Sequence, residues 1–260
     1  MENLRTYGNK PFKAAVIHGG PGASGEMAPV AKKLSFTYGV LEPLQTAKTI
    51  KGQIEELKTI IEENAELPIT LIGFSWGACL SILFAEEHPK FVKKLILVGS
   101  SGFEEKYAFQ TQETRFSRLT EEEKDKIEFL SQILNDSNSG KKNEAFCRLG
   151  KILSKADSYD PLIDKAETIN CNFDIYKNVW KEASELRKSR KLLKIIKKIK
   201  CPVVAIHGDF DSHPAKGIQK TLSENINNFR FILLKNCGHK PWMERQAKDR
   251  FYEIVNEILI

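Results

Sequence analysis

Short apolar runs alternate with helix-like stretches in two separate blocks of this 260-residue chain. The apolar runs lie at residues 14–17, 40–41, 69–72, 95–98, 203–206 and 231–234. Such alternation is typical of an α/β domain, because neighbouring parallel strands need a crossover helix between them. We therefore predict an α/β fold in which helices flank a mostly parallel central sheet.

The alternation stops between residues 101 and 200, where the sequence has no convincing strand. Polar stretches with helical character, such as 121–134 and 177–188, occupy this interval. The simplest interpretation is one α/β core domain formed by residues 1–100 and 201–260, with a helical insertion at 101–200. Only a short polar stretch precedes the first apolar run, so we expect no full pair of leading strands.

The net charge of +6 is concentrated in one segment of the chain. Residues 181–200 hold nine Lys or Arg and two Glu, and the rest of the chain is close to neutral. Leu192, Ile195 and Ile199 recur among these basic residues at near-helical spacing, which predicts an amphipathic helix with a solvated basic face. No aromatic residues are interleaved for base stacking, and no nucleic-acid-binding motif is found, so we predict no nucleic-acid partner.

The chain has five cysteines, an odd number with no C-x-x-C spacing. This pattern predicts buried or incidental thiols in a reducing compartment rather than disulfides or a zinc site. No apolar run approaches the roughly 20 residues that cross a bilayer, and residues 1–11 lack the apolar segment of a signal peptide. We therefore expect a cytoplasmic protein that does not bind membranes.

The strongest motif lies between the apolar run at 69–72 and the helical stretch that follows it. Residues 73–77 read Gly-Phe-Ser-Trp-Gly, which matches G-x-S-x-G. A nucleophile on a sharp strand-to-helix turn needs small neighbours two positions away on each side, because the chain passes itself closely there. The helix that follows directs its N-terminal amides toward the place where an oxyanion would form. The motif predicts Ser75 as a nucleophile.

A serine hydroxyl needs a general base, and the base needs an orienting carboxylate. In this architecture the partners follow in the order Ser, then Asp or Glu, then His. Asp211 lies just beyond the run at 203–206, and His239 lies just beyond the run at 231–234. The carboxyl ends of parallel strands share one edge of a sheet, so we expect the three side chains to converge there. Asp209 lies near the same strand end and is the alternative carboxylate.

An oxyanion hole needs two convergent N–H groups, one from the residue after the nucleophile and one from an early loop. Trp76 supplies the first of these groups. Gly20, in the loop after the run at 14–17, is the candidate for the second. The sequence therefore contains every group that acyl transfer by a serine requires.

These segments together resemble the α/β-hydrolase superfamily. The resemblance is carried by His18-Gly19-Gly20-Pro21-Gly22, Gly73-Phe74-Ser75-Trp76-Gly77, Gly208-Asp209-Phe210-Asp211 and Gly238-His239. The first two are most similar to the proline iminopeptidase branch, and esterases can share them. The resemblance implies an α/β-hydrolase fold in which the insertion forms a helical cap over the active site. It implies Ser75 as nucleophile, His239 as base, Asp211 as acid, and Gly20 with Trp76 as oxyanion donors.

We therefore predict a serine hydrolase that cleaves an ester or amide bond of a small molecule or short peptide through an acyl-enzyme, with no cofactor and no metal. The D-x-x-G-x-G-x-S stretch of many members is missing, since residues 41–45 run almost directly into a helix, and we expect a more open pocket. Iminopeptidases bind a free amino terminus with acidic side chains. The acidic residues considered in the insertion are Glu104, Glu105, Asp174 and Glu182.

Three other interpretations stay open. Residues 20–25 also match G-x-G-x-x-G, and Glu42 lies near the position of a ribose-binding acid, a pattern typical of a dinucleotide-dependent oxidoreductase. A metal site is suggested by the closely spaced His207, Asp209, Asp211 and His213. Finally, the same scaffold can carry a non-catalytic small-molecule-binding protein, because a fold does not fix a function.

Overall fold

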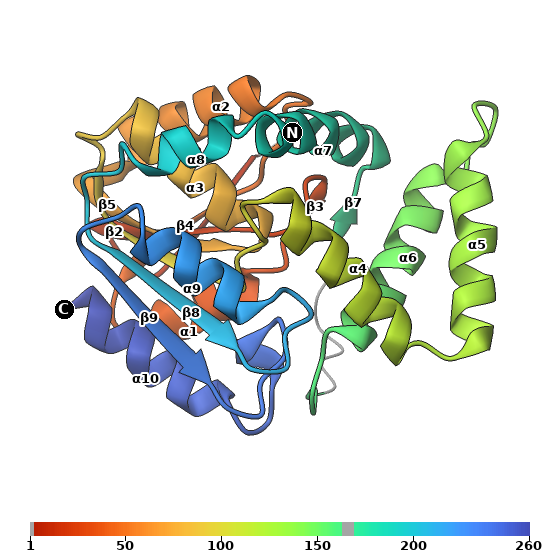
Figure 1. The fold of residues 1–260 in the computed structure, drawn as a ribbon. Coiled ribbons are helices and arrows are strands. Elements are labelled where there is room, and N and C mark those ends of the chain that lie inside the picture. The colour runs from red at the N-terminus through yellow and green to blue at the C-terminus, as the bar shows by residue number, and fades with distance from the viewer. Residues whose placement is uncertain (1–2, 163–168) are drawn as a thin grey trace.

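The computed structural model describes residues 3–162 and 169–260, and it has a central sheet between two layers of helices (Figure 1). The sheet has seven strands in the order β1-β4-β2-β5-β6-β8-β9. Their bounds are β1 (Leu4–Tyr7), β2 (Phe12–Ile17), β4 (Gly39–Pro43), β5 (Ala65–Phe74), β6 (Val92–Val98), β8 (Val203–Gly208) and β9 (Phe229–Leu234). All neighbouring strands pair in parallel except β1, which runs antiparallel to β4. The prediction of a mostly parallel sheet is confirmed, and each predicted run lies within one of these strands.

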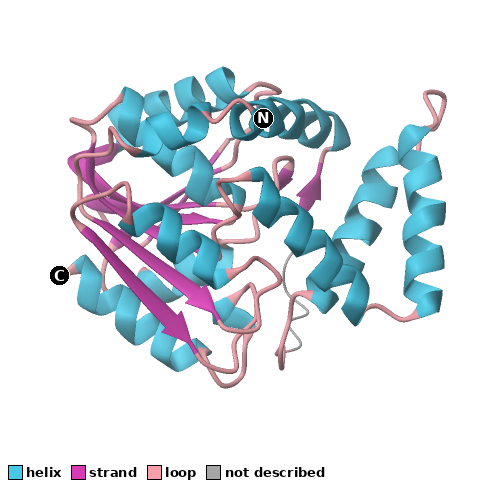
Figure 2. Cartoon of the chain, viewed as in Figure 1, coloured by secondary structure: helices cyan, strands magenta, loops and turns pink. Residues whose placement is uncertain are grey.

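Helices cover both faces of the sheet (Figure 2). One face carries α1 (Ala28–Leu34) and α10 (Lys248–Leu259), and the other carries α2 (Ile50–Asn64), α3 (Trp76–Glu87), α8 (Lys191–Ile196) and α9 (Ala215–Ser223). The two faces follow from the alternation of side chains along each strand. Along β2, Ala14 and Val16 join the apolar cluster of α1 and α10, whereas Ala15 and Ile17 join the cluster on the opposite face. The core therefore consists of two apolar layers separated by the sheet.

Among the described residues a single strand, β1, precedes β2, so no full pair of leading strands forms, as expected, although β1 itself was not predicted. The strand pairs with the edge of β4, whose backbone groups would otherwise lack partners. Its side chains also reach the buried Glu42 of β4. The Tyr7 hydroxyl donates to Glu42 Oε2 at 2.7 Å, and Arg5 lies 3.6 Å from the same oxygen. These contacts need no apolar periodicity in β1, which explains why the sequence pattern missed it.

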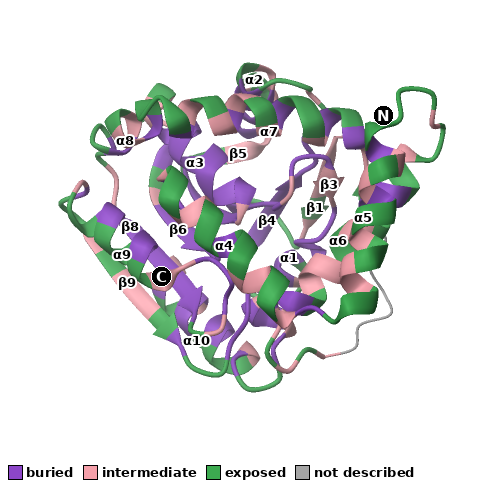
Figure 3. Ribbon diagram, turned by 45° about the vertical axis from the view of Figure 1, so that its right-hand side comes forward, coloured by how far each residue is buried: buried purple, intermediate pink, exposed green. Residues whose placement is uncertain are grey.

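Between β6 and β8 the chain forms α4 (Glu105–Arg118), α5 (Glu121–Asn135), α6 (Lys142–Ala156), α7 (Phe173–Lys188) and α8. Helices α5 and α6 lie beside the sheet layers rather than on a sheet face (Figures 1 and 3). A small apolar cluster joins them to the start of α7, and its members are Leu130, Leu134, Ala145, Phe146 and Phe173. The division into a core at 1–100 and 201–260 and a cap at 101–200 stays a prediction. Residues 163–168 of that cap, and residues 1–2 of the N-terminal stretch, lie outside the described residues.

The basic segment at 181–200 contains the end of α7, which covers the helical stretch predicted at 177–188, and α8, which is the amphipathic helix predicted around Leu192 and Ile195. Helix α7 ends at Lys188 and α8 begins at Lys191, and Arg190 between them has a left-handed backbone with φ 56°. Helix α8 still buries one apolar side, through Leu192 and Ile196. In the part of the chain that the structure describes, no helix has the length and apolar character that crossing a membrane requires.

A disulfide joins Cys147 of α6 to Cys171 of the short strand β7 (Asn170–Cys171). Strand β7 pairs with β3 (Ala23–Ser24), in the loop after β2. Two expectations are therefore wrong, because the cysteines are not all thiols and the insertion does contain a strand. The two cysteines are 24 residues apart, and only the tertiary packing of α6 near β7 brings them together. Disulfides persist in oxidising compartments, so the cysteines no longer support a cytoplasmic location, which stays a prediction.

Reduction of this disulfide is expected to destabilise the protein. In the chain-entropy model, a bond that closes a separation of 24 residues raises the free energy of unfolding by about 3 kcal/mol. Unfolding in urea with and without a reductant measures the difference. The double variant Cys147→Ser, Cys171→Ser is the control, because reductant should leave its unfolding curve unchanged. Wild-type curves that coincide in both conditions would contradict the expected stabilisation.

Candidate active site

Ser75 lies on a strained turn between β5 and α3. Its backbone has φ 50° and ψ −110°, a conformation that costs about 1–3 kcal/mol for a residue with a side chain. The Ser75 amide donates to the Val98 carbonyl oxygen at 2.9 Å, which fixes the turn to β6. A Cβ on Gly73 would collide with the Gly77 carbonyl, and a Cβ on Gly77 would collide with the Ile17 carbonyl. Both glycines of the G-x-S-x-G motif are therefore required by close backbone approach.

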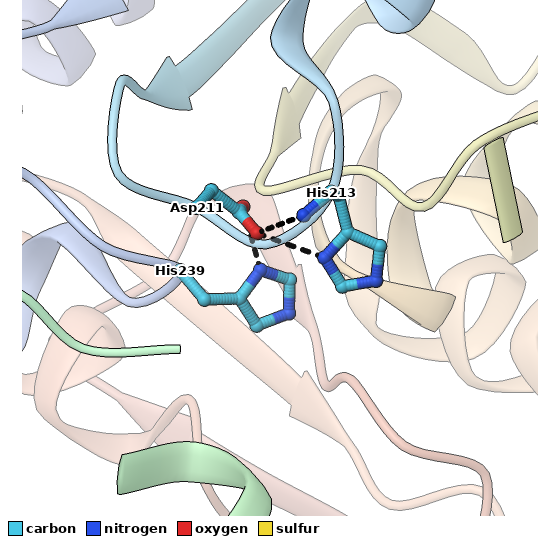
Figure 4. Close-up of side chains that lie close together, drawn as sticks. All are labelled: Asp211, His213 and His239. Atoms are coloured by element: carbon cyan, nitrogen blue, oxygen red, sulfur yellow. Dashed lines mark hydrogen bonds and ion pairs between the residues drawn. The ribbon is translucent and has the colours of Figure 1, made fainter. Parts of the chain in front are cut away.

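Asp211 and His239 meet beyond the carboxyl ends of β8 and β9 (Figure 4). His239 Nδ1 lies 2.7 Å from Asp211 Oδ2, and both residues are buried. Burial acts to raise the pKa of the Asp211 carboxyl, but three neighbouring histidines, His239 first among them, outweigh it and hold that pKa well below its usual range. Asp211 is therefore a carboxylate, and a carboxylate only accepts. This fixes the His239 ring with Nδ1 as the donor and leaves Nε2 as the basic nitrogen.

The His239 ring packs beside the turn that carries Ser75. Its centroid lies 4.7 Å from that of Phe74, the residue before Ser75. On the other side, a Cβ added to Gly99 would lie 3.0 Å from His239 Nδ1. No hydrogen bond joins Ser75 Oγ to His239 within residues 3–162 and 169–260, and such contacts are often long or misaligned before substrate binds. The turn and the imidazole lie at one sheet edge, and their catalytic roles stay predictions.

The two predicted oxyanion donors follow neighbouring strands. Ile17 at the end of β2 pairs with Gly73 near the end of β5, so the Gly20 loop and the Ser75 turn leave the sheet side by side. Gly20 has φ 28°, and its carbonyl oxygen accepts from the amide three residues later at 2.8 Å. Trp76 is the first residue of α3, where helix amides have no intrahelical partner. An oxyanion hole formed by Gly20 and Trp76 is compatible with this placement and stays a prediction.

The end of α4 holds the loop that carries Asp211. The Arg118 guanidinium donates to the Phe210 carbonyl oxygen at 2.8 Å and to Ser212 Oγ at 3.1 Å. These two residues flank Asp211 in the sequence. The guanidinium carbon also lies 3.7 Å from the centroid of the Phe210 ring, and Arg118 donates to the Ala156 carbonyl oxygen at 3.1 Å. One arginine therefore ties the Asp211 loop to both α4 and α6.

An ion pair one turn earlier on α4 supports the His239 loop. Arg115 contacts Asp157 at two points, with Nε 2.8 Å from Oδ1 and Nη2 2.6 Å from Oδ2. Burial acts to raise the pKa of Asp157, but the charge and hydrogen bonds of Arg115 outweigh it and lower that pKa. The carbonyl oxygen of Asp157 accepts from the His239 amide at 2.9 Å. The inserted helices thus hold the backbone of the predicted base as well as that of the predicted acid.

A second buried carboxylate, Glu244, fixes the same loop from the other side. Its oxygens accept from the amides of Gly238 at 3.0 Å, Tyr159 at 3.0 Å and Asp160 at 2.8 Å. Because Gly238 precedes His239, this carboxylate fixes the backbone immediately before the predicted base.

Four residues that hold the loops of Asp211 and His239 were not predicted from the sequence: Arg115, Arg118, Asp157 and Glu244. The contacts of Arg118 span 38 to 94 residues of sequence. Arg115 and Arg118 are one helical turn apart on a polar helix, which by itself is typical of a solvated surface. No signal in the sequence could therefore have separated these two arginines from arginines on a solvated surface.

The alternative carboxylate, Asp209, is exposed, accepts from the Cys237 amide at 3.2 Å and lies 3.7 Å from Lys235 Nζ, whereas Asp211 contacts His239.

The residues considered for a metal site are not grouped in the structure as the sequence suggested. Ligand atoms of Asp211, His213 and His239 lie within 4.8 Å of one another. Both histidine Nδ1 atoms already lie at hydrogen-bond distance from Asp211. The Nδ1 atoms of both rings and the Asp211 carboxylate are therefore engaged with one another.

Gly99→Ala is expected to disturb the His239 loop. Gly99 has φ 51°, and a Cβ there would lie 2.7 Å from the His239 carbonyl oxygen. We expect the free energy of unfolding to fall by about 2 kcal/mol, from backbone strain and the displaced loop. The matched control is Gly150→Ala in α6, where a Cβ meets nothing within 4 Å and better helix propensity should add about 1 kcal/mol. Urea unfolding compares the variants, and equal stability would contradict the close packing around His239.

A family described as "Serine aminopeptidase, S33" matches residues 47–246 of this chain. The chain is also 25% identical over 203 residues to the monoacylglycerol lipase ABHD6 of Mus musculus. The aligned region covers 77% of this chain and 58% of the lipase. It is 24% identical over 267 residues to the proline iminopeptidase of Saccharolobus solfataricus. That alignment covers 94% of this chain and 83% of the iminopeptidase. The chain therefore spans less than two thirds of the length of the lipases it matches.

The crystal structure of VinJ superposes on this chain with a TM-score of 0.68 at 15% identity, covering 98% of this chain and 93% of VinJ. At that identity the likeness shows the fold alone. The family match includes the positions of Ser75, Asp211 and His239 and extends over most of the chain. This chain belongs to the serine aminopeptidase S33 family of α/β-hydrolases.

Proposed function

We propose that the protein is a serine hydrolase that cleaves an ester or amide bond by acyl transfer. The observation that carries this proposal is the 2.7 Å contact between His239 Nδ1 and the buried Asp211, at the sheet edge where Ser75 occupies its strained turn. An imidazole backed by a carboxylate is the base that a serine nucleophile needs.

In the proposed reaction, Ser75 Oγ attacks the substrate carbonyl while His239 Nε2 takes the hydroxyl proton. Asp211 keeps the imidazole in the required tautomer and stabilises its charged form. The Gly20 and Trp76 amides stabilise the tetrahedral oxyanion, and one such donor is worth on the order of 10²–10³ in kcat. His239 gives its proton to the leaving group, then takes a proton from the water that attacks the acyl-enzyme, and returns it to Ser75 Oγ as the acid leaves.

The inserted helices have two roles in this proposal. Through Arg118 and Asp157 they hold the loops that carry the acid and the base. They also lie beside the carboxyl edge of the sheet, where they would limit which substrates reach Ser75. Such a cover excludes water and orients the substrate, which strengthens the electrostatic contacts of the site.

Among the possible substrates we favour an uncharged acyl ester over the N-terminal residue of a peptide. A cationic amino terminus needs an available carboxylate, and the acidic residues considered in the insertion are used elsewhere or exposed. Glu182 accepts from the Ile50 amide at 2.8 Å. Asp174 and Glu104 form ion pairs with lysines, and Glu105 is exposed. The relatives include a monoacylglycerol lipase, whose name indicates ester cleavage, and a proline iminopeptidase, whose name indicates peptide cleavage.

The dinucleotide-dependent alternative receives no support from this geometry. Glu42, the acid considered for a ribose, is buried and accepts from Tyr7. Within residues 20–25, a Cβ on Gly22 would collide with the Asn172 carbonyl, so this part of the loop is packed against the insertion. It therefore has no open cradle at Gly22 of the kind that a pyrophosphate needs. Turnover and covalent labelling of Ser75 distinguish a catalytic protein from the non-catalytic alternative.

Ser75→Ala should abolish turnover of p-nitrophenyl acetate, by about 10⁴-fold or more, because the nucleophile is removed. It should also abolish labelling by a fluorophosphonate probe, which gel fluorescence detects. Ser223→Ala, at the exposed end of α9, is the matched control and should retain both. Unchanged labelling of Ser75→Ala would refute the proposal. Tight binding of a small molecule without any turnover by the wild type would indicate the non-catalytic alternative.

The acid limb of the pH dependence of kcat/KM should report one proton. Burial lowers the pKa of His213 to about 4. Although Asp211 is also buried, its histidines hold its pKa well below the usual range. At neutral pH His213 is therefore uncharged and Asp211 ionised, so neither group should add to the slope of the acid limb as the pH falls toward about 5. A plot of log kcat/KM against pH should rise with a slope of one and then level off, and a slope of two would contradict this assignment.

A further inference from the structure

Asp211 binds a second histidine, His213, which the proposed mechanism does not use. His213 Nδ1 lies 2.8 Å from Asp211 Oδ1, and the His213 amide donates to the same oxygen at 2.9 Å. The other carboxylate oxygen faces His239 Nδ1 at 2.7 Å. In Figure 4 both rings direct one nitrogen at the carboxylate. The two rings stack, with centroids 4.5 Å apart and an interplanar angle of 25°.

We propose that His213 is a positioning residue for the acid of the active site. Its side chain and its amide hold one oxygen of Asp211, and this aligns the second oxygen with the Nδ1–H of His239. The effect on turnover rests on the proposed function. The structural part concerns only these three residues and can be tested without any assumption about Ser75.

The hydrogen-bond pattern fixes where the protons of this cluster lie. An ionised carboxylate only accepts, so both histidines present an Nδ1–H to Asp211. Burial lowers the pKa of His213 to about 4. At neutral pH the His213 ring is therefore uncharged, and its single proton is the one that it donates to Asp211.

A third histidine holds His213 in place. His207 Nε2 lies 2.9 Å from the His213 carbonyl oxygen and 3.3 Å from Asp211 Oδ2. Because a carbonyl oxygen only accepts, this nitrogen carries the proton. From the inserted helices the charged groups that face the cluster are Arg115 and Asp157, which form an ion pair of their own. The cluster is thus held on its outer sides by the Nε2–H of His207 and by the Arg115–Asp157 ion pair.

Donors on both oxygens limit the motion of the Asp211 carboxylate. A carboxylate held at one oxygen can turn about its Cβ–Cγ bond, which moves the accepting oxygen away from the base. A misplacement of about 1 Å in an active site can cost about 10²-fold in rate. His213 limits this rotation through two donors on Oδ1, its side chain and its amide, and a substitution that removes the side-chain donor leaves the amide as the only His213 group on that oxygen.

Two substitutions at this position separate the hydrogen bond from the ring. In His213→Asn the side-chain amide nitrogen can occupy the place of the imidazole Nδ1 and donate to Asp211. In His213→Gln the amide nitrogen lies one bond farther out, near the place of Nε2, and does not reach the same oxygen. Both substitutions remove the ring that stacks on His239. Both are made in the full-length chain.

For p-nitrophenyl acetate, we expect His213→Asn to keep kcat within about threefold of the wild type. His213→Gln should lower kcat by about ten- to hundredfold, with KM changed by less than about twofold, because the loss is one of alignment rather than of substrate binding. The downfield proton resonance of the Nδ1–H between His239 and Asp211 gives a second readout. It should stay sharp in His213→Asn and shift upfield or broaden in His213→Gln.

Equal kcat and an unchanged resonance in both variants would overturn the proposal. Equal impairment of both would also overturn it, because the effect would then belong to the ring. If His213→Gln does not fold, as judged by circular dichroism, His213→Ala replaces it, since that variant also lacks the side-chain donor. The proposed function fails separately, when Ser75→Ala keeps full turnover, and the resonance then still tests the role of His213.

Discussion

Asp211 is a carboxylate buried among three histidines, beyond the end of β8. Moving a carboxylate from water into a protein interior costs several kcal/mol unless hydrogen bonds and charges compensate for it. Here donors reach both of its oxygens, so it stays ionised and can fix the tautomer of His239. The surrounding loops are therefore restricted to arrangements that satisfy this one group. The chemistry proposed at Ser75 depends on that restriction, because without it the base has no defined orientation.

The helices inserted between β6 and β8 contribute to this restriction as much as the sheet does. Arg118 holds the loop of Asp211, and the Asp157 carbonyl holds the amide of His239. Strand β7 pairs with β3 in the loop that contains Gly20, and the Cys147–Cys171 disulfide links β7 to α6. The inserted segment thus contacts the loops that carry the predicted acid, the predicted base and the predicted oxyanion donor Gly20. A substrate that moved these helices would alter the alignment of all three together.

The parts of the structure that could be predicted are those encoded by local patterns. Each predicted apolar run lies in a strand of the sheet, and the G-x-S-x-G spacing located the Ser75 turn because its two glycines face other backbone segments. Chain order and the shared sheet edge brought Asp211 and His239 together. By contrast, β1, β7, the disulfide and Arg118 depend on partners far away in the sequence. A strand of two residues, or one that pairs at an edge through polar side chains, has no periodicity to detect.

The most direct measurement of the central claim is a crystal structure of the protein after reaction with a phosphonate ester. The phosphorus should be bonded to Ser75 Oγ, and the phosphoryl oxygen should lie about 2.7–3.1 Å from the amides of Gly20 and Trp76. His239 Nε2 should lie within hydrogen-bond distance of the adduct, with Asp211 still bound to its other nitrogen. Phosphorus attached to a different side chain, or a phosphoryl oxygen directed away from both amides, would contradict the claim that these residues form one catalytic site.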